Sequence, residues 1–435
     1  MPVDDRERAQ ARLILEGHPT AATHPPAGQW DDDDVGNIGY FYRQYSILVR
    51  EPDAARVTDA LGVIFAEVGY GSVPAGAARE IQRESVTSGL VRLTVPSVPT
   101  LVPDLIGRLD GAVGQGVARP EHKIYVCPHT CPATEPAEVP GTADPVPPLG
   151  LDAGGRRAVP WTGNDGEGVS VVIVDTGLIP QVAADHPWLA GVEGAEENPY
   201  GADGTIVPYG GHGTFVTGVL RCVAPKATVF VERAFDIAGA DYETRLASSL
   251  ADALQHDPDI MVFTFTSATH RDSSLHTFDD FYERRLSRRK GLVVLAPAGN
   301  DNWSRRMWPA AHHGVIGVGA LAANWRDRAH FTNYGRWVDV YAPGENLVNA
   351  YPEGTYVCTE PPDAGERRLL RGMAMWSGTS FSTPVVAGLI AARMSRTGQN
   401  AQQAWDSLQR FACSQAIPGV GPVLYPGQAG CEPGH

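Results

Sequence analysis

The stretch VSVVIVDTGL, residues 169–178, decides the fold class of this chain. Its apolar run is long enough for a strand buried on both faces, and the run ends on the acidic residue Asp175. Similar runs are ATVFVERAF (227–235), DIMVFTFTS (259–267), GLVVLAPAGN (291–300) and VIGVGAL (315–321), with helical stretches such as TRLASSLADALQHD (244–257) and TPVVAGLIAARMSR (383–396) between them. Strands that alternate with helices predict a parallel sheet covered on both sides. Functional groups of such sheets collect beyond the carboxyl ends of the strands.

A smaller region of different pattern, residues 45–126, precedes this one. It alternates short strands with amphipathic helices: YSILVR (45–50), ARVTDALGVIFAEV (55–68), GLVRLTVP (89–96), TLVPDLIGRLDG (100–111) and KIYV (123–126). This order predicts a small α+β, ferredoxin-like domain with one sheet faced by two helices. The domain is thus expected at 45–126, and the larger α/β domain at 151–435.

The remaining parts of the chain are polar or rich in proline. Residues 1–44 include the acidic run Asp31–Asp34, and we expect a solvated, disordered tail there. Residues 127–150 include CPATEPAEVPGTADPVPPLG (131–150), which has six prolines and few apolar residues. An extended, mobile linker between the two domains is the expected structure.

Bulk composition excludes several function classes. The 435 residues are 43% hydrophobic and 20% charged, as in ordinary globular proteins, and the net charge of −15 argues against nucleic-acid or anionic-membrane partners. No segment approaches the roughly 20 apolar residues that span a bilayer. The N-terminal sequence lacks the basic start and apolar run of a signal peptide. We expect a cytoplasmic protein; a different true start would make export the alternative.

The six cysteines are expected to be reduced thiols, because an export signal is not apparent. Cys127 and Cys131 flank His129 in CPHTC, which superficially suggests metal ligation. A zinc site needs about four ligands, usually in matched pairs, and the sequence offers no second close pair of cysteines. The interpretation favoured is that no metal is bound at this motif.

Four polar residues stand at strand ends or helix starts of the larger domain. Asp175 ends one strand, His212 lies between glycines in GGHGTFVTGVL (210–220), Asn300 ends another strand, and Ser380 precedes an apolar helix. Each has a simple structural interpretation when taken alone. Asp175 and Ser380 could cap helices, Asn300 could form a turn, and a single histidine is usually a spectator.

Taken together, the four residues supply the parts of a serine hydrolase. A serine hydroxyl needs a base, the base imidazole needs a carboxylate, and the tetrahedral intermediate needs oxyanion donors. The chain order Asp, His, Ser differs from that of nucleophile-elbow hydrolases and of chymotrypsin. Residues 378–382, GTSFS, also lack the second glycine of G-x-S-x-G.

With these motifs in order, the sequence resembles the subtilisin-like serine peptidases, the subtilases, over roughly residues 150–425. The matching stretches are VIVDTGL (172–178), GGHGTFVTGV (210–219), APAGN (296–300), WPAAHHGVIGVGAL (308–321), FTNYGRWVDVYAPGE (331–345) and SGTSFSTPVVAG (377–388). The resemblance implies a subtilisin-like three-layer α/β fold and a serine endopeptidase that acts on peptides or proteins. A catalytically silent peptide-binding or scaffold protein on this fold is the alternative.

The resemblance also implies roles for the four residues. Ser380 is expected as the nucleophile, His212 as the base and Asp175 as its orienting carboxylate. The Asn300 amide and the Ser380 backbone N–H are expected to form the oxyanion hole. No cofactor is expected; calcium is frequent in the family, but the sequence shows no acidic loop that assigns ligands.

Some segments depart from the family pattern. Subtilases usually carry Ser-Leu-Gly along the substrate cleft, whereas the matching residues here are Thr264, Phe265 and Thr266. We expect a more crowded cleft wall, with Phe265 covering the non-prime subsites. Pro297 is also unusual, because it stands on a wall that normally carries small residues. Residues 351–376 are longer than the family norm and are interpreted as a lid, a partner surface or an ordinary insertion.

The small domain at 45–126 has two interpretations. Subtilase propeptides are small α+β domains that plug the cleft with their C-terminal strand, so the region after Lys123 is expected to be the plug, with cleavage in 127–150. The competing interpretation is a permanent docking domain for a regulatory partner or a protein substrate.

Overall fold

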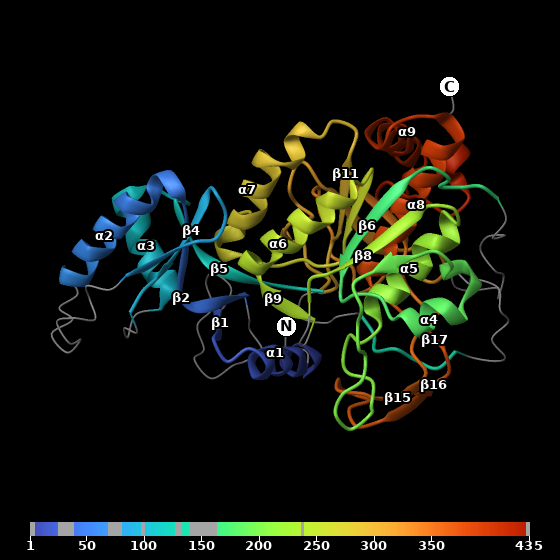
Figure 1. Cartoon of the computed structure of the whole chain (residues 1–435), viewed down its shortest axis with the longest axis horizontal. Helices are drawn as coiled ribbons and strands as arrows, with labels where there is room; N and C mark the ends of the chain where they lie inside the picture. The colour runs from blue at the N-terminus through green and yellow to red at the C-terminus, as the bar shows by residue number, and fades with distance from the viewer. Residues whose placement is uncertain are drawn as a thin grey trace.

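The computed structural model describes residues 5–24, 39–67, 81–96, 101–126, 133–139, 163–235 and 239–431. They form a small N-terminal lobe beside a larger lobe that contains the C-terminal half of the chain (Figure 1). Helices α2 (Ala54–Glu67) and α3 (Val102–Val113) cover one face of the small lobe's sheet. Helices α6 (Glu243–Ala253) and α7 (His276–Arg284) belong to the larger lobe and lie next to the sheet of the small lobe (Figure 1).

The larger lobe is built on a seven-stranded sheet of order β13-β12-β11-β10-β6-β8-β7. All of its strand pairs are parallel; for example, Ile260 lies opposite Val171. The strands are β6 (Ser170–Asp175), β7 (Glu193–Gly194), β8 (Thr228–Arg233), β10 (Ile260–Phe263), β11 (Val293–Pro297), β12 (Ile316–Leu321) and β13 (Val340–Pro343). This pairing confirms the expected parallel sheet. Its continuous apolar runs are buried on both faces, as is typical of parallel strands.

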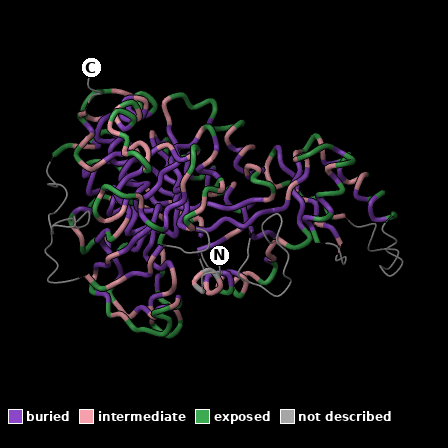
Figure 2. Tube along the Cα trace, turned by 180° about the vertical axis from the view of Figure 1, so that it is seen from behind, coloured by how far each residue is buried: buried purple, intermediate pink, exposed green. Residues whose placement is uncertain are grey.

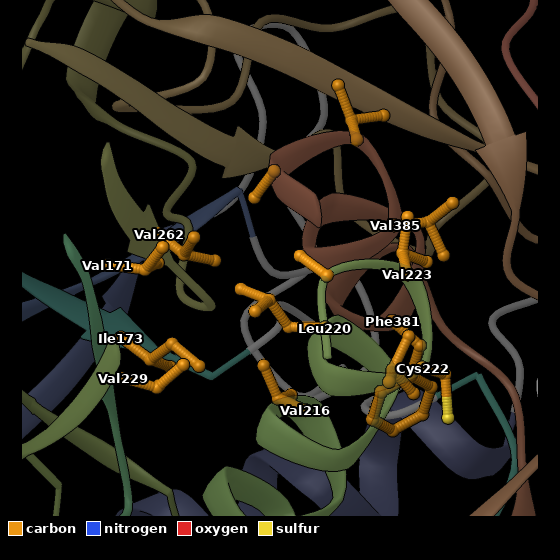
Figure 3. Packing of buried hydrophobic residues seen from close by; sticks show 14 of the residues in the cluster. Val171, Ile173, Val216, Leu220, Cys222, Val223, Val229, Val262, Phe381 and Val385 are labelled. Atoms are coloured by element: carbon orange, nitrogen blue, oxygen red, sulfur yellow. The ribbon is translucent and has the colours of Figure 1, made fainter. Parts of the chain in front are cut away.

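Helices cover both faces of this sheet, which gives three layers. Alternate residues of β6 divide between them: Val171 and Ile173 pack toward α5 and α8, whereas Val172 and Val174 pack toward α6 and α7. Figure 3 shows the first of these cores, where Leu220 of α5 lies between the valines of the strands and the pair Val223 and Val385. The helices are α4 (Pro180–Asp185), α5 (His212–Val223), α6 (Glu243–Ala253), α7 (His276–Arg284), α8 (Thr379–Thr397) and α9 (Ala401–Ser414).

Two short antiparallel pairs lie beside this core. They are β14 (Leu347–Ala350) with β17 (Met373–Trp376), and β15 (Gly354–Val357) with β16 (Arg367–Leu370). The β15–β16 hairpin belongs to the segment 351–376, which the sequence marks as an insertion, and it lies at the lower edge of the molecule in Figure 1. Among the described helices, none is both long and apolar enough to cross a membrane.

The small lobe has the ferredoxin-like arrangement that the sequence predicts. Its antiparallel sheet has the order β3-β4-β2-β5, and α2 and α3 pack on one face. The elements are β2 (Tyr40–Arg50), α2 (Ala54–Glu67), β3 (Gln82–Ser85), β4 (Leu90–Thr94), α3 (Val102–Val113) and β5 (Ala118–Tyr125).

A single sheet connects the two lobes. Strand β5 pairs antiparallel with β9 (Ala240–Tyr242) of the larger lobe, so that Ile124 lies opposite Asp241. Buried residues continue along this sheet from the core of one lobe to the other (Figure 2). Strand β9 has three residues, too few for the sequence pattern to reveal.

The prediction of a disordered tail at 1–44 is wrong for the part that the structure describes. Residues Asp5–Gly17 form α1, and β1 (Ala21–His24) pairs with β2. Ala11 and Ile14 of α1 are buried against Phe41 and Tyr125. Tertiary packing of these few apolar side chains therefore orders a segment whose composition is mainly polar. The acidic run Asp31–Asp34 lies outside the described residues.

The prediction of a mobile linker at 127–150 is wrong for residues 133–139. Ala133 and Glu135 are buried, and Ala137 exchanges backbone hydrogen bonds with Met375. A proline-rich segment has few hydrogen bonds of its own to offer, and here the larger lobe supplies the partners. Residues 127–132 and 140–162, which include the CPHTC motif, lie outside the described residues.

Candidate active site

His212 is the first residue of α5, and two glycines bring it close to the end of β6. The N-cap Gly211 has a left-handed backbone with φ of 83°, and a Cβ there would come 2.7 Å from Pro352. A Cβ on Gly213 would lie 2.4 Å from the carbonyl oxygen of Gly177, in the loop after Asp175. Because only glycine fits both places, the GGHG sequence lets the histidine approach the strand end.

Asp175, His212 and Ser380 form one hydrogen-bonded chain. The Nδ1 atom of His212 lies 2.9 and 2.8 Å from the two carboxylate oxygens of Asp175, and its Nε2 atom lies 3.0 Å from the Oγ atom of Ser380. All three side chains are fully buried. With the Nδ1 proton directed to the carboxylate, Nε2 is the acceptor that faces the serine hydroxyl.

Ser380 is not the helix cap that its local sequence suggests. Helix α8 begins at Thr379, its N-cap is Gly378, and no side chain caps it. The Ser380 hydroxyl is therefore directed to His212, while its backbone N–H belongs to the first turn of the helix. Positive potential at this helix end stabilises negative charge that develops beside the hydroxyl.

Asn300 lies next to the same helix start. Its Oδ1 atom accepts bonds from the backbone N–H and the hydroxyl of Thr379, each at 2.9 Å. These two bonds fix the orientation of the amide and turn its NH₂ group away from Thr379. The Asn300 side chain is 2% exposed, so the NH₂ group is held in a site that contains little water.

Aromatic side chains hold the imidazole from two sides. Trp376 meets His212 edge to face, with ring centroids 5.5 Å apart. The ring centroid of Phe381 lies 5.2 Å from that of His212, and the two rings are tilted. Both are buried, so they exclude water from the hydrogen bonds of the imidazole. Neither was predicted from the sequence, although both belong to the WSGTSF stretch around Ser380.

Glu197 joins the residue before His212 to the residue after Asp175. It accepts hydrogen bonds from the Gly211 backbone N–H at 3.0 Å and from the Thr176 hydroxyl at 3.0 Å. Burial, together with a smaller effect of the Asp175 carboxylate, raises the pKa of Glu197 to about 8, although the bonds from Gly211 and Thr176 oppose the shift. No motif in the sequence marks this residue, because its role depends on the loop that brings it beside Gly211.

The expected cleft residues lie in different environments. Thr264 is buried with its hydroxyl on the Val174 carbonyl oxygen, and Pro297 is buried at the end of β11 opposite Val318. Phe265 is fully buried and stacks on Phe263 in the core under α6 and α7. Phe263 and Phe265 are two residues apart in an extended segment and turn to the same face. Ile124 and Val126 of the small lobe belong to the same buried cluster, so the covering of substrate subsites by Phe265 stays a prediction.

Thr266 pairs through its backbone with the small lobe, and its place in the substrate cleft stays a prediction. Tyr125 and Thr266 form an antiparallel bridge with N–O distances of 2.9 and 3.3 Å. The Val126 N–H bonds to the carbonyl oxygen of Gly239 at 2.8 Å. The end of β5 is thus inserted as an extended strand between β9 and the segment after β10, at the carboxyl edge of the parallel sheet.

The structure assembles no metal cluster from the residues that it describes: no group of three or more His, Cys, Asp or Glu side chains is placed to hold an ion. Calcium binding stays a prediction without a ligand set. Within the same residues, Cys222, Cys358, Cys413 and Cys431 are free thiols. Burial raises the pKa of Cys222 to about 12, which keeps this thiol protonated and unreactive.

Residues 166–418 match the family model of the subtilases, peptidase family S8. The chain therefore belongs to the subtilase family, and it is a subtilisin-like serine endopeptidase whose substrates are peptides or proteins. Asp175, His212, Asn300 and Ser380 all lie inside the matched range.

Named relatives agree with this assignment. The chain is 29% identical to thermitase of Thermoactinomyces vulgaris over 271 residues, which cover 60% of this chain and 86% of thermitase. It is 28% identical to subtilisin DY of Bacillus licheniformis over 265 residues, or 57% of this chain and 85% of that protein. Both alignments leave a large part of this chain unmatched.

A solved structure is similar over more of the chain. Fervidolysin from Fervidobacterium pennivorans, described as a keratinolytic enzyme related to subtilisin, matches 94% of this chain with a TM-score of 0.57. The identity is 18%, so the match concerns the fold alone. The chain covers 63% of fervidolysin, which is the longer protein.

Proposed function

We propose that Ser380, His212 and Asp175 are the catalytic triad of this endopeptidase. The Ser380 hydroxyl attacks the scissile carbonyl while Nε2 of His212 takes its proton, and the same proton then goes to the leaving amine. Asp175 holds the imidazole in the tautomer with Nδ1 protonated and stabilises the imidazolium that forms. The observation that carries this proposal is the continuous Asp175–His212–Ser380 hydrogen-bond chain, with both joints at 3.0 Å or less.

Asn300 and the Ser380 backbone N–H are proposed as the oxyanion hole. The amide of Asn300 is held by Thr379, the residue next to the nucleophile, so that its NH₂ group and the helix start are parts of one rigid unit. Donors fixed in advance stabilise the tetrahedral oxyanion without reorganisation during the reaction.

We further propose that residues 39–126 act as an inhibitory domain in the uncut chain. The support is the position of β5, which forms the backbone bonds to Gly239 and Thr266 that an extended peptide substrate would form. Ile124 and Val126 are each at most 1% exposed and share a buried cluster with Phe265 of the larger lobe, so this side of the cleft is built for apolar side chains. An extended substrate with apolar residues on the amino side of the cut bond is therefore the proposed substrate class.

The active-site proposal is tested with a fluorophosphonate probe on the purified chain after incubation. Covalent labelling is expected for the natural sequence and not for Ser380→Ala, and mass spectrometry should place the label on Ser380. An unlabelled, correctly folded protein that has been cut within residues 127–150 would support the silent scaffold instead.

Self-processing is tested on the same two proteins by gel electrophoresis and mass spectrometry. The natural chain should divide within residues 127–150, whereas Ser380→Ala should remain in one piece. If both are cut at the same place, another protease is responsible. If neither is cut while the probe labels Ser380, the small lobe is the permanent docking domain that the sequence also allows.

A further inference from the structure

The insertion at 351–376 holds a buried carboxylate of the linker. Glu135 is 8% exposed, and its Oε1 atom accepts bonds from the Tyr356 hydroxyl at 2.8 Å, the Thr359 N–H at 2.7 Å and the Thr359 hydroxyl at 3.1 Å. Its Oε2 atom lies 3.4 Å from the Glu360 N–H. Burying a carboxylate is costly unless donors replace its water, and these donors all come from the β15–β16 hairpin. The hairpin thus forms a site shaped for a carboxylate.

The residues around Glu135 pair with the strand that leads to the nucleophile. Ala137 and Met375 exchange two backbone bonds of 2.9 Å, and the Trp376 indole N–H donates to the Thr134 carbonyl oxygen at 2.5 Å. The Ser377 N–H donates to the Thr134 hydroxyl at 3.2 Å. Because Ser377 is three residues before Ser380, the bound linker pairs with the segment that leads directly to the nucleophile.

The direction of the chain assigns this site to one side of the cut bond. Val126, the last described residue of the preceding segment, is bonded to Gly239 on the amino-terminal part of the cleft. Ala133, the next described residue, is already buried against Ala320 and Phe331 near the strand that precedes Ser380. The bond that is cut in self-processing must lie between these two anchors. Glu135 therefore lies a few residues beyond it, on the carboxyl side.

We propose that the β15–β16 hairpin is a substrate-binding site for a glutamate side chain on the carboxyl side of the scissile bond. Tyr356 and Thr359 are its specificity residues, and the linker of the uncut chain is its first occupant. The inference rests on the proposed function, since it needs an active enzyme that cuts near this point. It adds a required acidic residue to a substrate that is otherwise selected by apolar side chains at the other end of the cleft.

Two arginines, one from α1 and one from the hairpin, also hold the linker in this position. Arg6 of α1 forms a salt bridge with Glu360 at 3.0 Å and donates to the Ala133 carbonyl oxygen at 3.1 Å. Arg368 donates to the Pro136 carbonyl oxygen at 3.2 Å. The carbonyl groups of Ala133 and Pro136, on either side of Glu135, are therefore held by basic side chains, whereas Glu135 is recognised through its carboxylate.

The test uses internally quenched peptides with the sequence of residues 122–142, HKIYVCPHTCPATEPAEVPGT. Residues 133–139 stay attached to the larger lobe after the cut, so the enzyme carries Glu135→Ala, which leaves the hairpin site open to the peptide, and a trace of active enzyme completes its processing. Changing Glu135→Ala in the peptide should lower kcat/KM about tenfold or more, mainly through KM, because a charge-assisted contact is lost. Changing Glu138→Ala is the matched control. That side chain has the same charge and reaches the Leu369 N–H, but it is exposed, so the loss should stay below about twofold.

A paired change in the enzyme locates the effect. With Tyr356→Phe and Thr359→Val together, the preference for Glu135 over Ala in the peptide should shrink from about tenfold to a few fold, because two of the donors are gone. Equal cleavage of the two peptides by the Glu135→Ala enzyme would overturn the inference, and so would an unchanged preference when Tyr356→Phe and Thr359→Val are added to it.

A short substrate separates this failure from failure of the proposed function. Peptide HKIYVC (residues 122–127) with a fluorogenic leaving group ends before the hairpin site. If the protein cleaves it and reacts with fluorophosphonate, the proposed function stands whatever the Glu135 result. If it does neither, the proposed function is wrong and the specificity inference is overturned with it.

Discussion

Within the described residues, two histidine–carboxylate pairs are fully buried, and one of them belongs to the proposed active site. His212 contacts Asp175 at 2.8 Å, and His122 contacts Glu243 at 3.0 Å, in each case through Nδ1 and with both side chains fully buried. The difference is the partner of Nε2. In His212 this atom faces the Ser380 hydroxyl, whereas in His122 it accepts a bond from the backbone N–H of His270.

The group that faces Nε2 therefore decides whether a pair takes part in catalysis or only holds the two lobes together. A base needs a proton that it can take from a nucleophile, and the His270 amide proton is not available for that purpose. His122 instead joins β5 to helix α6 and to the segment after Thr266, because Glu243 also accepts bonds from the His122 and Thr277 backbone N–H groups. A pair of matching side chains is not a catalytic site until a reactive group completes it.

The largest effect on kcat is expected when the histidine of each pair is replaced in turn. His212→Ala should lower kcat by about 10⁶, as loss of the base does in subtilisin, because the hydroxyl loses its proton acceptor. His122→Ala should not lower kcat of the processed enzyme at all. Both are measured with the short peptide substrate after processing is completed by a trace of active enzyme. A comparable loss in His122→Ala would place that pair in the chemistry.

Asn300→Ala should have the next largest effect. Removal of one oxyanion donor lowers kcat by about 10²–10³ while KM changes little, because the bond strengthens in the transition state. Thr379 also loses the Asn300 oxygen, so the measurement should include the melting temperature. A fall in KM and kcat together with a large fall in melting temperature would indicate a structural role instead.

His122→Ala should instead weaken the contact between the lobes. In a Ser380→Ala background, which keeps the chain in one piece, it should lower the free energy of unfolding by about 1.5–3 kcal/mol, since the Glu243 carboxylate loses a buried partner. Denaturant titration measures this change. His313→Ala, a histidine outside both pairs, serves as the control. Loss of less than about 0.5 kcal/mol would show that the buried pair contributes little.

The two regions should also differ in the sign of their pH dependence. Burial lowers the pKa of Lys123 in the interface to about 7, with Asp241 and Glu121 opposing and Arg43 adding to the shift. Between about 7 and 10.5 the unfolded chain holds this proton and the folded chain does not, so stability should rise with pH by at most about 1.4 kcal/mol per unit. Comparing Ser380→Ala with and without Lys123→Met at pH 7.5 and 9.5 tests the slope.

Glu197 beside the triad should give the opposite slope. Its pKa is raised to about 8 by burial, so between about 4.5 and 8 the folded chain holds a proton that the unfolded chain has lost. Stability should therefore fall as pH rises through this range, and Glu197→Gln should remove this part of the dependence. Melting temperatures of the Ser380→Ala and Ser380→Ala/Glu197→Gln chains at pH 5.5 and 8.5 measure the effect. Parallel curves for the two chains would contradict it.

Much of the fold could be predicted from the sequence, because its signals are local. Continuous apolar runs such as VVIV before Asp175 allow only strands buried on both sides, and the helices between them force parallel pairing. The ferredoxin-like lobe was predictable in the same way from the alternation of strands and helices. Local patterns failed at α1 and at residues 133–139, where a few side chains are ordered by partners far away in the chain.

The sequence by itself determined the four residues of the candidate site, since glycines and strand ends around Asp175, His212, Asn300 and Ser380 carry the constraint that brings them together. Only the tertiary structure decided which side chains surround them. It turned Phe265 into the core and brought Glu197 to the loop before His212. It also paired the end of β5 with Thr266 and brought Glu135 to the Tyr356 hydroxyl. These contacts join residues more than a hundred positions apart or depend on a loop path, and no local spacing rule encodes either.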